Sequence, residues 1–181
     1  DAYCRDISVK IRSHLEIKRK QGQYIGNYVS YGYRKCDDDK HKIEIDTYAA
    51  NVVKDIFRMK LQGMSQDAIA CKLNENGILC PADYKKSEGS NYQTSFKIKD
   101  KSGWSSTTVR RILTNEIYIG NLVQGKHTTP NHKVKKMYVK DESEWVRIEK
   151  NHEAIVSERD FELVQRLLVM NTRTAPGNNE V

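Results

Sequence analysis

The stretch GWSSTTVRRILTN, residues 103–115, predicts a short helix with two different faces. Ser105 has a hydroxyl that can cap the first turn, and Trp104 before it has the spacing of a hydrophobic staple to Val109. Three apolar residues then recur at helical spacing, so one face should point into a core. These residues are Val109, Ile112 and Leu113.

The opposite face of this helix carries only hydroxyl, amide and cationic groups, without a carboxylate. It comprises Thr107, Thr108, Arg110, Arg111 and Thr114, with Asn115 beside them. A solvated helix usually mixes both signs of charge. Arginine is the usual reader of guanine, and threonine can contact thymine methyl groups or phosphates. Ser105, Ser106 and the helix N-terminus suit a phosphate. The pattern therefore favours a helix that lies against a polyanion.

Composition supports such a partner. The chain has 181 residues, with 31 Lys and Arg against 24 Asp and Glu, a formal charge of +7 and 38% hydrophobic residues. This length suits one domain with an appendage. The basic residues gather in the first 35 positions and again at Lys133, Lys135, Lys136 and Lys140. Clusters of this kind are typical of nucleic-acid binding, although a plain solvated basic surface is the alternative.

Signs of other chemistry are missing from the sequence. It has no phosphate-binding glycine loop, no H-E-x-x-H and no nucleophile elbow. The four cysteines form no C-x-x-C pair and the histidines have no metal-ligand spacing, so we expect no metal and no cofactor. Cys71 is expected in the core, and His152 in a structural role or in a contact at the entry of a helix. With no membrane-length apolar stretch or signal peptide, a reducing, cytoplasmic setting is expected. A binding module is favoured over an enzyme.

The rest of the chain predicts an α+β fold that is mainly helical. Helices are expected over residues 7–21, from Asp46 to Gly63 and from Ser65 to Gly77, and a last helix begins at Ser157. The tight turn at Gly63 favours the front half of a helix-turn-helix, or a plain helical hairpin. Residues 78–103 should form a long loop that interrupts this motif. Runs within 117–126, 135–140 and 144–150 predict a small antiparallel sheet.

Several segments, taken in order, resemble the recombinase domain of large serine recombinases. They are YGYR (31–34), residues 45–78, Pro81, WSSTTVRRILTNEIYIGNLVQGK (104–126) and NHEAIVSERDFELVQRLL (151–168). The resemblance covers nearly the whole chain from Gly22 to Leu168. It departs from the family at Ser30–Tyr31, where proline is usual, and in the long, lysine-rich loop 82–103.

The resemblance implies a DNA-binding domain that follows a catalytic domain. Residues 1–25 would end the connecting helix, 26–170 would form the recombinase domain, and 171–181 would lead toward a zinc ribbon. The fragment would lack the catalytic serine, while its parent would be an enzyme, dimeric on each double-stranded attachment site, tetrameric in synapsis and associated with a bacterial nucleoid. Further expected DNA contacts are Tyr31, Tyr33, Arg34, Lys35, Lys126, Lys133, Lys135 and Lys136.

Three alternatives have different consequences. A stand-alone winged helix-turn-helix regulator would use the small sheet as its wing. A DNA-processing nuclease would use carboxylates such as Asp37, Asp38 and Asp39, although this run is typical of a turn. A basic protein-interaction module would show no salt-sensitive affinity for DNA.

Overall fold

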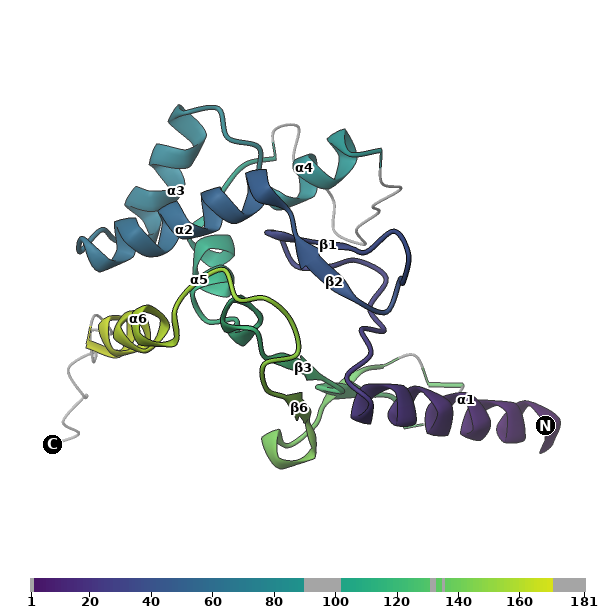
Figure 1. Ribbon diagram of the computed structural model, residues 1–181. Helices are drawn as coiled ribbons and strands as arrows, with labels where there is room; N and C mark the ends of the chain where they lie inside the picture. Colours follow the sequence, from purple (N-terminus) through teal and green to yellow (C-terminus); the bar gives the residue numbers. More distant parts are fainter. Residues whose placement is uncertain (1, 90–101, 131–132, 135, 171–181) are drawn as a thin grey trace, which may run out of the picture. The chain divides into compact units, whose positions relative to one another are not determined.

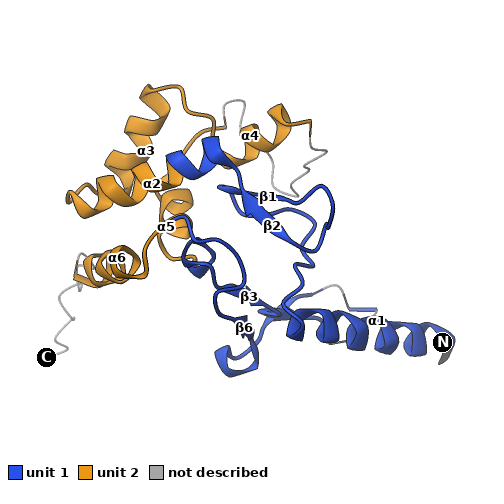
Figure 2. Cartoon of the chain, viewed as in Figure 1, with its two compact units in different colours: residues 1–51, 116–155 blue, residues 52–115, 156–181 orange. Residues whose placement is uncertain are grey.

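The computed structural model describes residues 2–89, 102–130, 133–134 and 136–170. The chain forms two units, each built from two segments (Figure 2). Unit 1 comprises residues 1–51 and 116–155, and unit 2 comprises residues 52–115 and 156–181. The described residues contain six α-helices and three small antiparallel sheets (Figure 1), which confirms a mainly helical α+β class.

Unit 1 contains helix α1 and all of the strands. Its elements are α1 (Ala2–Lys20), β1 (Tyr33–Lys35), β2 (Ile43–Ile45), the 3-10 helix η1 (Glu116–Ile119), β3 (Leu122–Gln124), β4 (His127–Thr128), β5 (Tyr138–Val139), the 3-10 helix η2 (Glu142–Glu144) and β6 (Val146–Ile148). Helix α1 begins earlier than predicted, and its C-terminal end lies beside β3 and β6 (Figure 1). Helix α2 starts at Thr47 and contains the boundary with unit 2.

The strands pair as three separate ribbons, β1–β2, β3–β6 and β4–β5, instead of the one small sheet that the sequence predicts. All three pairs are antiparallel, with Tyr33 opposite Ile45, Leu122 opposite Ile148 and His127 opposite Val139. Each of these strands is only two or three residues long.

Aromatic side chains build the core of unit 1. The Tyr33 ring lies 6.2 Å from the Tyr118 ring and meets the His152 ring edge-on at 4.9 Å. The Tyr33 hydroxyl donates to the carbonyls of Ile117 (3.1 Å) and Glu153 (2.8 Å), and Tyr118 donates to the Tyr31 carbonyl (2.8 Å). Burial raises the pKa of the Tyr33 phenol. These hydroxyl bonds join the β1 hairpin to the segments around η1 and β6.

His152 has the structural role that the sequence predicts. Its Nε2 lies 2.8 Å from the Ile117 carbonyl, so this nitrogen carries the proton, and the buried Nδ1 has no hydrogen-bond partner in the described structure. Burial lowers the pKa of His152, against a smaller opposite effect of the bond to Ile117. A second proton would put a charge on a buried nitrogen without an acceptor.

Unit 2 is helical. It contains most of α2 (Thr47–Leu61) and all of α3 (Gln66–Glu75), α4 (Pro81–Ser87), α5 (Ser106–Leu113) and α6 (Glu158–Met170). Gly63 turns the chain after α2 with φ +91°, and the Ser65 hydroxyl then caps α3 by accepting the Ala68 amide at 3.1 Å. The core gathers fully buried apolar side chains of α2, α3, α5 and α6. They include Val53, Ile56, Ile69, Leu73, Val109, Leu113 and Val164.

Two sequence-based predictions about unit 2 were wrong. Residues 78–103 were predicted to be irregular, but Pro81 opens α4, because proline is well suited to the first helical turn. Cys71 was predicted in the core but is exposed, because Ile69, Ala70 and Leu73 fill the buried face of α3. Residues 90–101 of the predicted loop, the tail 171–181 and Lys135 lie outside the described residues.

Candidate nucleic-acid interface

Helix α5 has the two faces that its sequence predicts. The Ser105 hydroxyl accepts the Thr108 amide at 3.2 Å, and Val109, Ile112 and Leu113 are buried. At the other end, the Thr114 hydroxyl donates to the Arg110 carbonyl at 2.9 Å. Both ends of this short helix are thus closed by its own hydroxyl side chains.

Helix α6 supplies a further partner for the end of α5. The Gln165 amide donates to the Leu113 carbonyl at 2.7 Å, which satisfies one of the carbonyls that a helix leaves open at its C-terminus. The Phe57 and Phe161 rings, 6.1 Å apart, pack α2 against α6. The buried face of α5 therefore rests on a rigid helical base.

The outer face of α5 is free to meet a ligand. Thr107, Arg110, Arg111 and Thr114 are exposed, while Ser106 and Thr108 are half-buried. Neither Arg110 nor Arg111 forms an ion pair with any residue that the structure describes. A guanidinium that is already paired would have to break that pair before it could bind an anion, and these two have no such cost.

The start of α5 is tied to the end of α3 by a contact that sequence reasoning missed. The Asn74 carboxamide accepts the Trp104 amide at 2.8 Å and donates to the Trp104 carbonyl at 3.0 Å. The Trp104 indole N–H donates to the Ile78 carbonyl at 2.9 Å, and its ring is buried. We call these three bonds the Asn74–Trp104 clamp. Asn74 lies 30 positions from Trp104, so no local sequence pattern predicts their contact.

The structure places Tyr31 and Tyr33 in the core of unit 1, each only 5% exposed. Both were predicted to follow the DNA backbone. The bonds of the Tyr33 hydroxyl to two carbonyls and the packing of its ring on His152 explain its burial. These two tyrosines therefore have no accessible ring or hydroxyl to offer a ligand, which corrects the prediction for them.

The other predicted contacts of unit 1 are spread over several elements. Arg34 is exposed but forms an ion pair with Glu44 across the β1–β2 ribbon at 2.7 Å. Lys126 lies over the Trp145 ring at 4.7 Å, and Lys136 lies over the Tyr138 ring at 5.4 Å. Lys35 is half-buried and Lys133 exposed. The structure does not gather these residues into one site.

A basic cleft between α1 and the β4–β5 ribbon is the other candidate surface, and the sequence analysis did not single it out. Its volume is about 320 Å³, and its lining includes Arg12, Arg19, His127 and Lys140. The Arg12 guanidinium donates to the Thr129 hydroxyl at 3.4 Å. Arg12, Glu16 and Arg19 have i, i+4, i+7 spacing, a signal that was present in the sequence.

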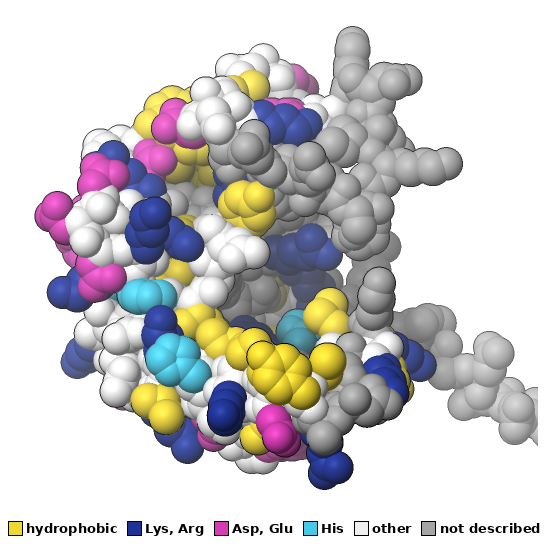
Figure 3. Space-filling model, turned by 90° about the vertical axis from the view of Figure 1, so that its right-hand side faces the viewer, with side chains coloured by type: hydrophobic (Ala, Val, Ile, Leu, Met, Phe, Trp, Pro, Cys, Tyr) yellow, Lys and Arg dark blue, Asp and Glu magenta, His cyan; other side chains and the backbone are white. Residues whose placement is uncertain are grey.

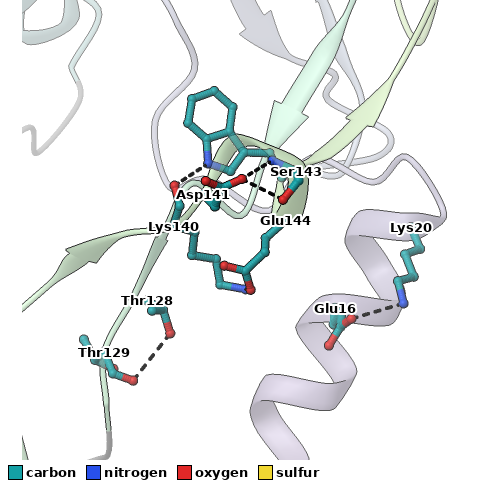
Figure 4. Close-up of polar contacts among 9 residues, drawn as sticks. Glu16, Lys20, Thr128, Thr129, Lys140, Asp141, Ser143 and Glu144 are labelled. Carbon is teal, nitrogen blue, oxygen red and sulfur yellow. Dashed lines mark hydrogen bonds and ion pairs between the residues drawn. The ribbon is translucent and has the colours of Figure 1, made fainter.

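The carboxylates near this cleft are already paired (Figure 4). Glu16 binds Lys20 at 3.1 Å, and Glu144 binds Lys140 at 3.4 Å. The hydrogen bond from Lys20 is the main cause that lowers the pKa of Glu16. The Arg19 Nε is buried and has no hydrogen-bond partner among the described residues. The cleft thus keeps donors of Arg12 and Arg19 that its own carboxylates do not neutralise.

Other surface features are less distinctive. Lysine and arginine side chains are scattered among acidic and hydrophobic ones over the face shown in Figure 3. Within the described part of the chain, no three His, Cys, Asp or Glu side chains group as metal ligands would. No described helix combines the length and the apolar character needed to cross a bilayer.

A capped helix with an unpaired cationic face, packed on a helical base, is a design typical of nucleic-acid-binding domains. Comparison with known proteins gives the family. The family model described as Recombinase matches residues 47–171. The chain therefore belongs to this family, the large serine recombinases, as the resemblance of its motifs predicted.

Individual relatives are distant and longer. The uncharacterised protein YefB of Bacillus subtilis (strain 168) is 33% identical over 73 residues, which cover 40% of this chain and 24% of YefB. A structure described as "Crystal Structure of a LSR-DNA Complex" is similar with a TM-score of 0.53 and 18% identity, over 92% of this chain and 42% of that one.

A second structure, from work on "Sequence Requirements of the Listeria innocua prophage attP site", has a TM-score of 0.52 and 19% identity, over 91% of this chain and 56% of that one. At these identities the likeness shows a shared fold. The chain spans less than two thirds of each of these three relatives.

Proposed function

We propose that this domain binds duplex DNA in a sequence-specific manner and positions a serine recombinase on its attachment site. The observation that carries the proposal is the outer face of α5, where Arg110 and Arg111 are exposed and have no ion-pair partner among the described residues. In the major groove, an arginine that binds guanine through two hydrogen bonds contributes about 1–3 kcal/mol of discrimination between bases.

The arrangement of α2, α3 and α5 supports an interrupted helix-turn-helix in which α5 is the recognition helix. The turn at Gly63 joins the first two helices, and the Asn74–Trp104 clamp returns the chain to the end of α3 before α5 begins. The hydroxyls of Ser105 and Ser106 at the start of α5 would lie near a phosphate. Thr107, Thr108 and Thr114 would complete the groove contacts.

Contacts to the sugar-phosphate backbone would come from the cations of unit 1. Arg34, Lys35, Lys126, Lys133 and Lys136 stay in this proposal, Lys135 remains a prediction, and the basic cleft adds Arg12 and Arg19. Phosphate contacts fix position and contribute to affinity without reading sequence. Chemistry would belong to a catalytic domain of the parent, which would act as a dimer on each site and a tetramer in synapsis.

The test measures affinity and its salt dependence. The chain is used to enrich sites from a randomised duplex library, and its affinity for the enriched duplex is compared with that for random duplex at two salt concentrations. We expect a clear preference and a log–log slope of about −0.9 for each phosphate contacted. Neither strand breaks nor joined products should appear. An affinity that ignores salt, or a library that yields no preferred sequence, contradicts the proposal.

Matched variants separate the two kinds of contact. Lys136→Ala should weaken enriched and random duplex alike and flatten the salt slope by about one unit, whereas a base reader should lose mainly the preference. Lys54→Ala removes an exposed lysine of α2 outside the proposed contacts and should change neither.

A further inference from the structure

Residues 76–105, which include α4, separate α3 from α5 where a helix-turn-helix usually has a turn of a few residues. A chain connection of this length does not by itself fix the second helix against the first, whereas a turn of a few residues does. A recognition helix has to be held more firmly, because misplacing its side chains by about 1 Å loses hydrogen bonds to the bases.

The Asn74–Trp104 clamp holds the start of α5 against the end of α3 through direct contacts. Asn74 lies in the last turn of α3, and its carboxamide pairs with both backbone groups of Trp104, as a neighbouring peptide would. The Trp104 indole adds a bond to Ile78, just beyond α3. The residue before the cap of α5 is thereby fixed at three points to the end of α3.

Gly103 shows how closely this contact is fitted. A Cβ placed on Gly103 would lie 3.0 Å from the Asn74 Oδ1, which is tighter than ordinary van der Waals contact. A glycine at this position leaves room for the carboxamide to reach the backbone of Trp104. The sequence Gly103–Trp104–Ser105 thus supplies the space, the clamped peptide and the helix cap in three consecutive residues.

We propose that Asn74 is a positioning residue for the recognition helix, acting through Trp104 and without touching DNA itself. This inference rests on the proposed function for its DNA readout, and its structural readout is independent of it. The clamp sets the direction of α5 together with the packing of its buried face on the neighbouring helices.

The structural arm follows hydrogen exchange of single amides by NMR in the unaltered chain and in Asn74→Ala. The Trp104 amide donates to Asn74, so its exchange should rise about tenfold in the variant, together with exchange in α5, while α2 is unchanged. Asn74→Asp keeps the acceptor and should keep the Trp104 amide protected. Unchanged exchange at Trp104 and in α5 in Asn74→Ala overturns the proposal.

The DNA arm compares affinity for the enriched and the random duplex. Asn74→Ala should lower the ratio of the two about tenfold and leave the affinity for random duplex unchanged. Asn76→Ala, at an exposed asparagine just beyond the same helix, is the matched control and should keep the ratio. A ratio in Asn74→Ala equal to that of the unaltered chain overturns the positioning role.

If Asn74→Ala does not fold, Asn74→Leu, which keeps the side-chain volume but can neither accept nor donate, is compared with Asn76→Leu on both duplexes, and equal ratios overturn the proposal. If the unaltered chain prefers no sequence, the proposed function fails, and the exchange of the Trp104 amide still decides whether the clamp positions α5.

Discussion

Helix α5 and the segment from Tyr31 to Lys35 both carry hydroxyl and cationic side chains, yet the fold uses them in opposite ways. On α5 these groups are exposed, and the apolar residues between them are buried. In the second segment the two tyrosines are buried and only Arg34 is exposed. A tyrosine can bury its large ring in a core while its hydroxyl binds a carbonyl, whereas the threonines of α5 have no such ring to bury.

The largest expected effect tests the buried side of this comparison. Tyr33→Ala should lower the free energy of unfolding by about 3–5 kcal/mol, because it removes a buried ring together with the hydroxyl that donates to the carbonyls of Ile117 and Glu153. Urea unfolding followed by circular dichroism measures this. Tyr3→Ala, at a tyrosine that is 76% exposed, should change stability by less than about 0.5 kcal/mol. A Tyr33→Ala variant that is as stable as the unaltered chain but binds DNA poorly would indicate that Tyr33 contacts DNA.

The next effect tests the exposed side. Arg111→Ala should cost about 1–3 kcal/mol in binding the enriched duplex and relax the preference at one base pair, with stability unchanged within about 0.5 kcal/mol. Arg111 lies at the centre of the polar face, so the same change at Arg110 should cost less. Affinities for enriched and random duplex at two salt concentrations measure this. Equal losses on both duplexes would make α5 an electrostatic clamp and not a reader of bases.

A smaller effect concerns the N-terminus of α5. Ser105→Ala removes the acceptor of the Thr108 amide and should lower the free energy of unfolding by about 1 kcal/mol. Ser105→Asp restores a capping oxygen and should recover most of this stability, but its charge should weaken DNA binding if a phosphate lies there. Identical DNA affinities for the Asp variant and the unaltered chain would indicate that no phosphate binds at the N-terminus of α5.

The smallest effect is a dependence of stability on pH that arises beside Tyr33. The folded-state pKa of His152 lies below its ordinary value of 6.5, so the unfolded chain takes up the proton first as pH falls. Stability is then lost from about pH 6.5 downward, until the folded protein also binds the proton. His152→Gln should reduce this loss between roughly pH 7 and pH 5. Urea unfolding at the two pH values measures this loss of stability. An unchanged pH dependence in the variant would show that His152 is not its cause.

The contrast also explains what the sequence could predict. Helices α2, α3 and α5 follow from apolar periodicity with Asp46, Ser65 and Ser105 as start signals, and the structure has all three. The outer face of α5 was predictable for the same reason, because a period of 3.6 residues separates inside from outside. The segment around Tyr31 has no such period, and its glycines and tyrosines fit an exposed arm as well as a buried corner.

What sequence reasoning missed depends on contacts between distant residues. The Asn74–Trp104 clamp joins positions 30 apart, and the cleft of α1 faces strands more than 100 residues away. Strands β3, β5 and β6 lie within the runs that were predicted as strands, but the pairing into three separate ribbons escaped prediction, because β3 pairs with β6, which is distant in sequence. Helix α4 has one local signal, Pro81, that the loop interpretation overlooked.

The interleaved path of the two units has a consequence for how the chain is made. Unit 1 needs residues 116–155 to complete it, and unit 2 needs residues beyond 155. A ribosome releases the chain from its N-terminus, so the first 51 residues emerge long before the β3–β6 ribbon that completes their unit. Tyr33 and its neighbours in the first 51 residues therefore stay exposed until residues 116–155 have been synthesised. We expect this segment to depend on chaperones during synthesis. Translation speed over residues 52–115 would then set how long that exposure lasts.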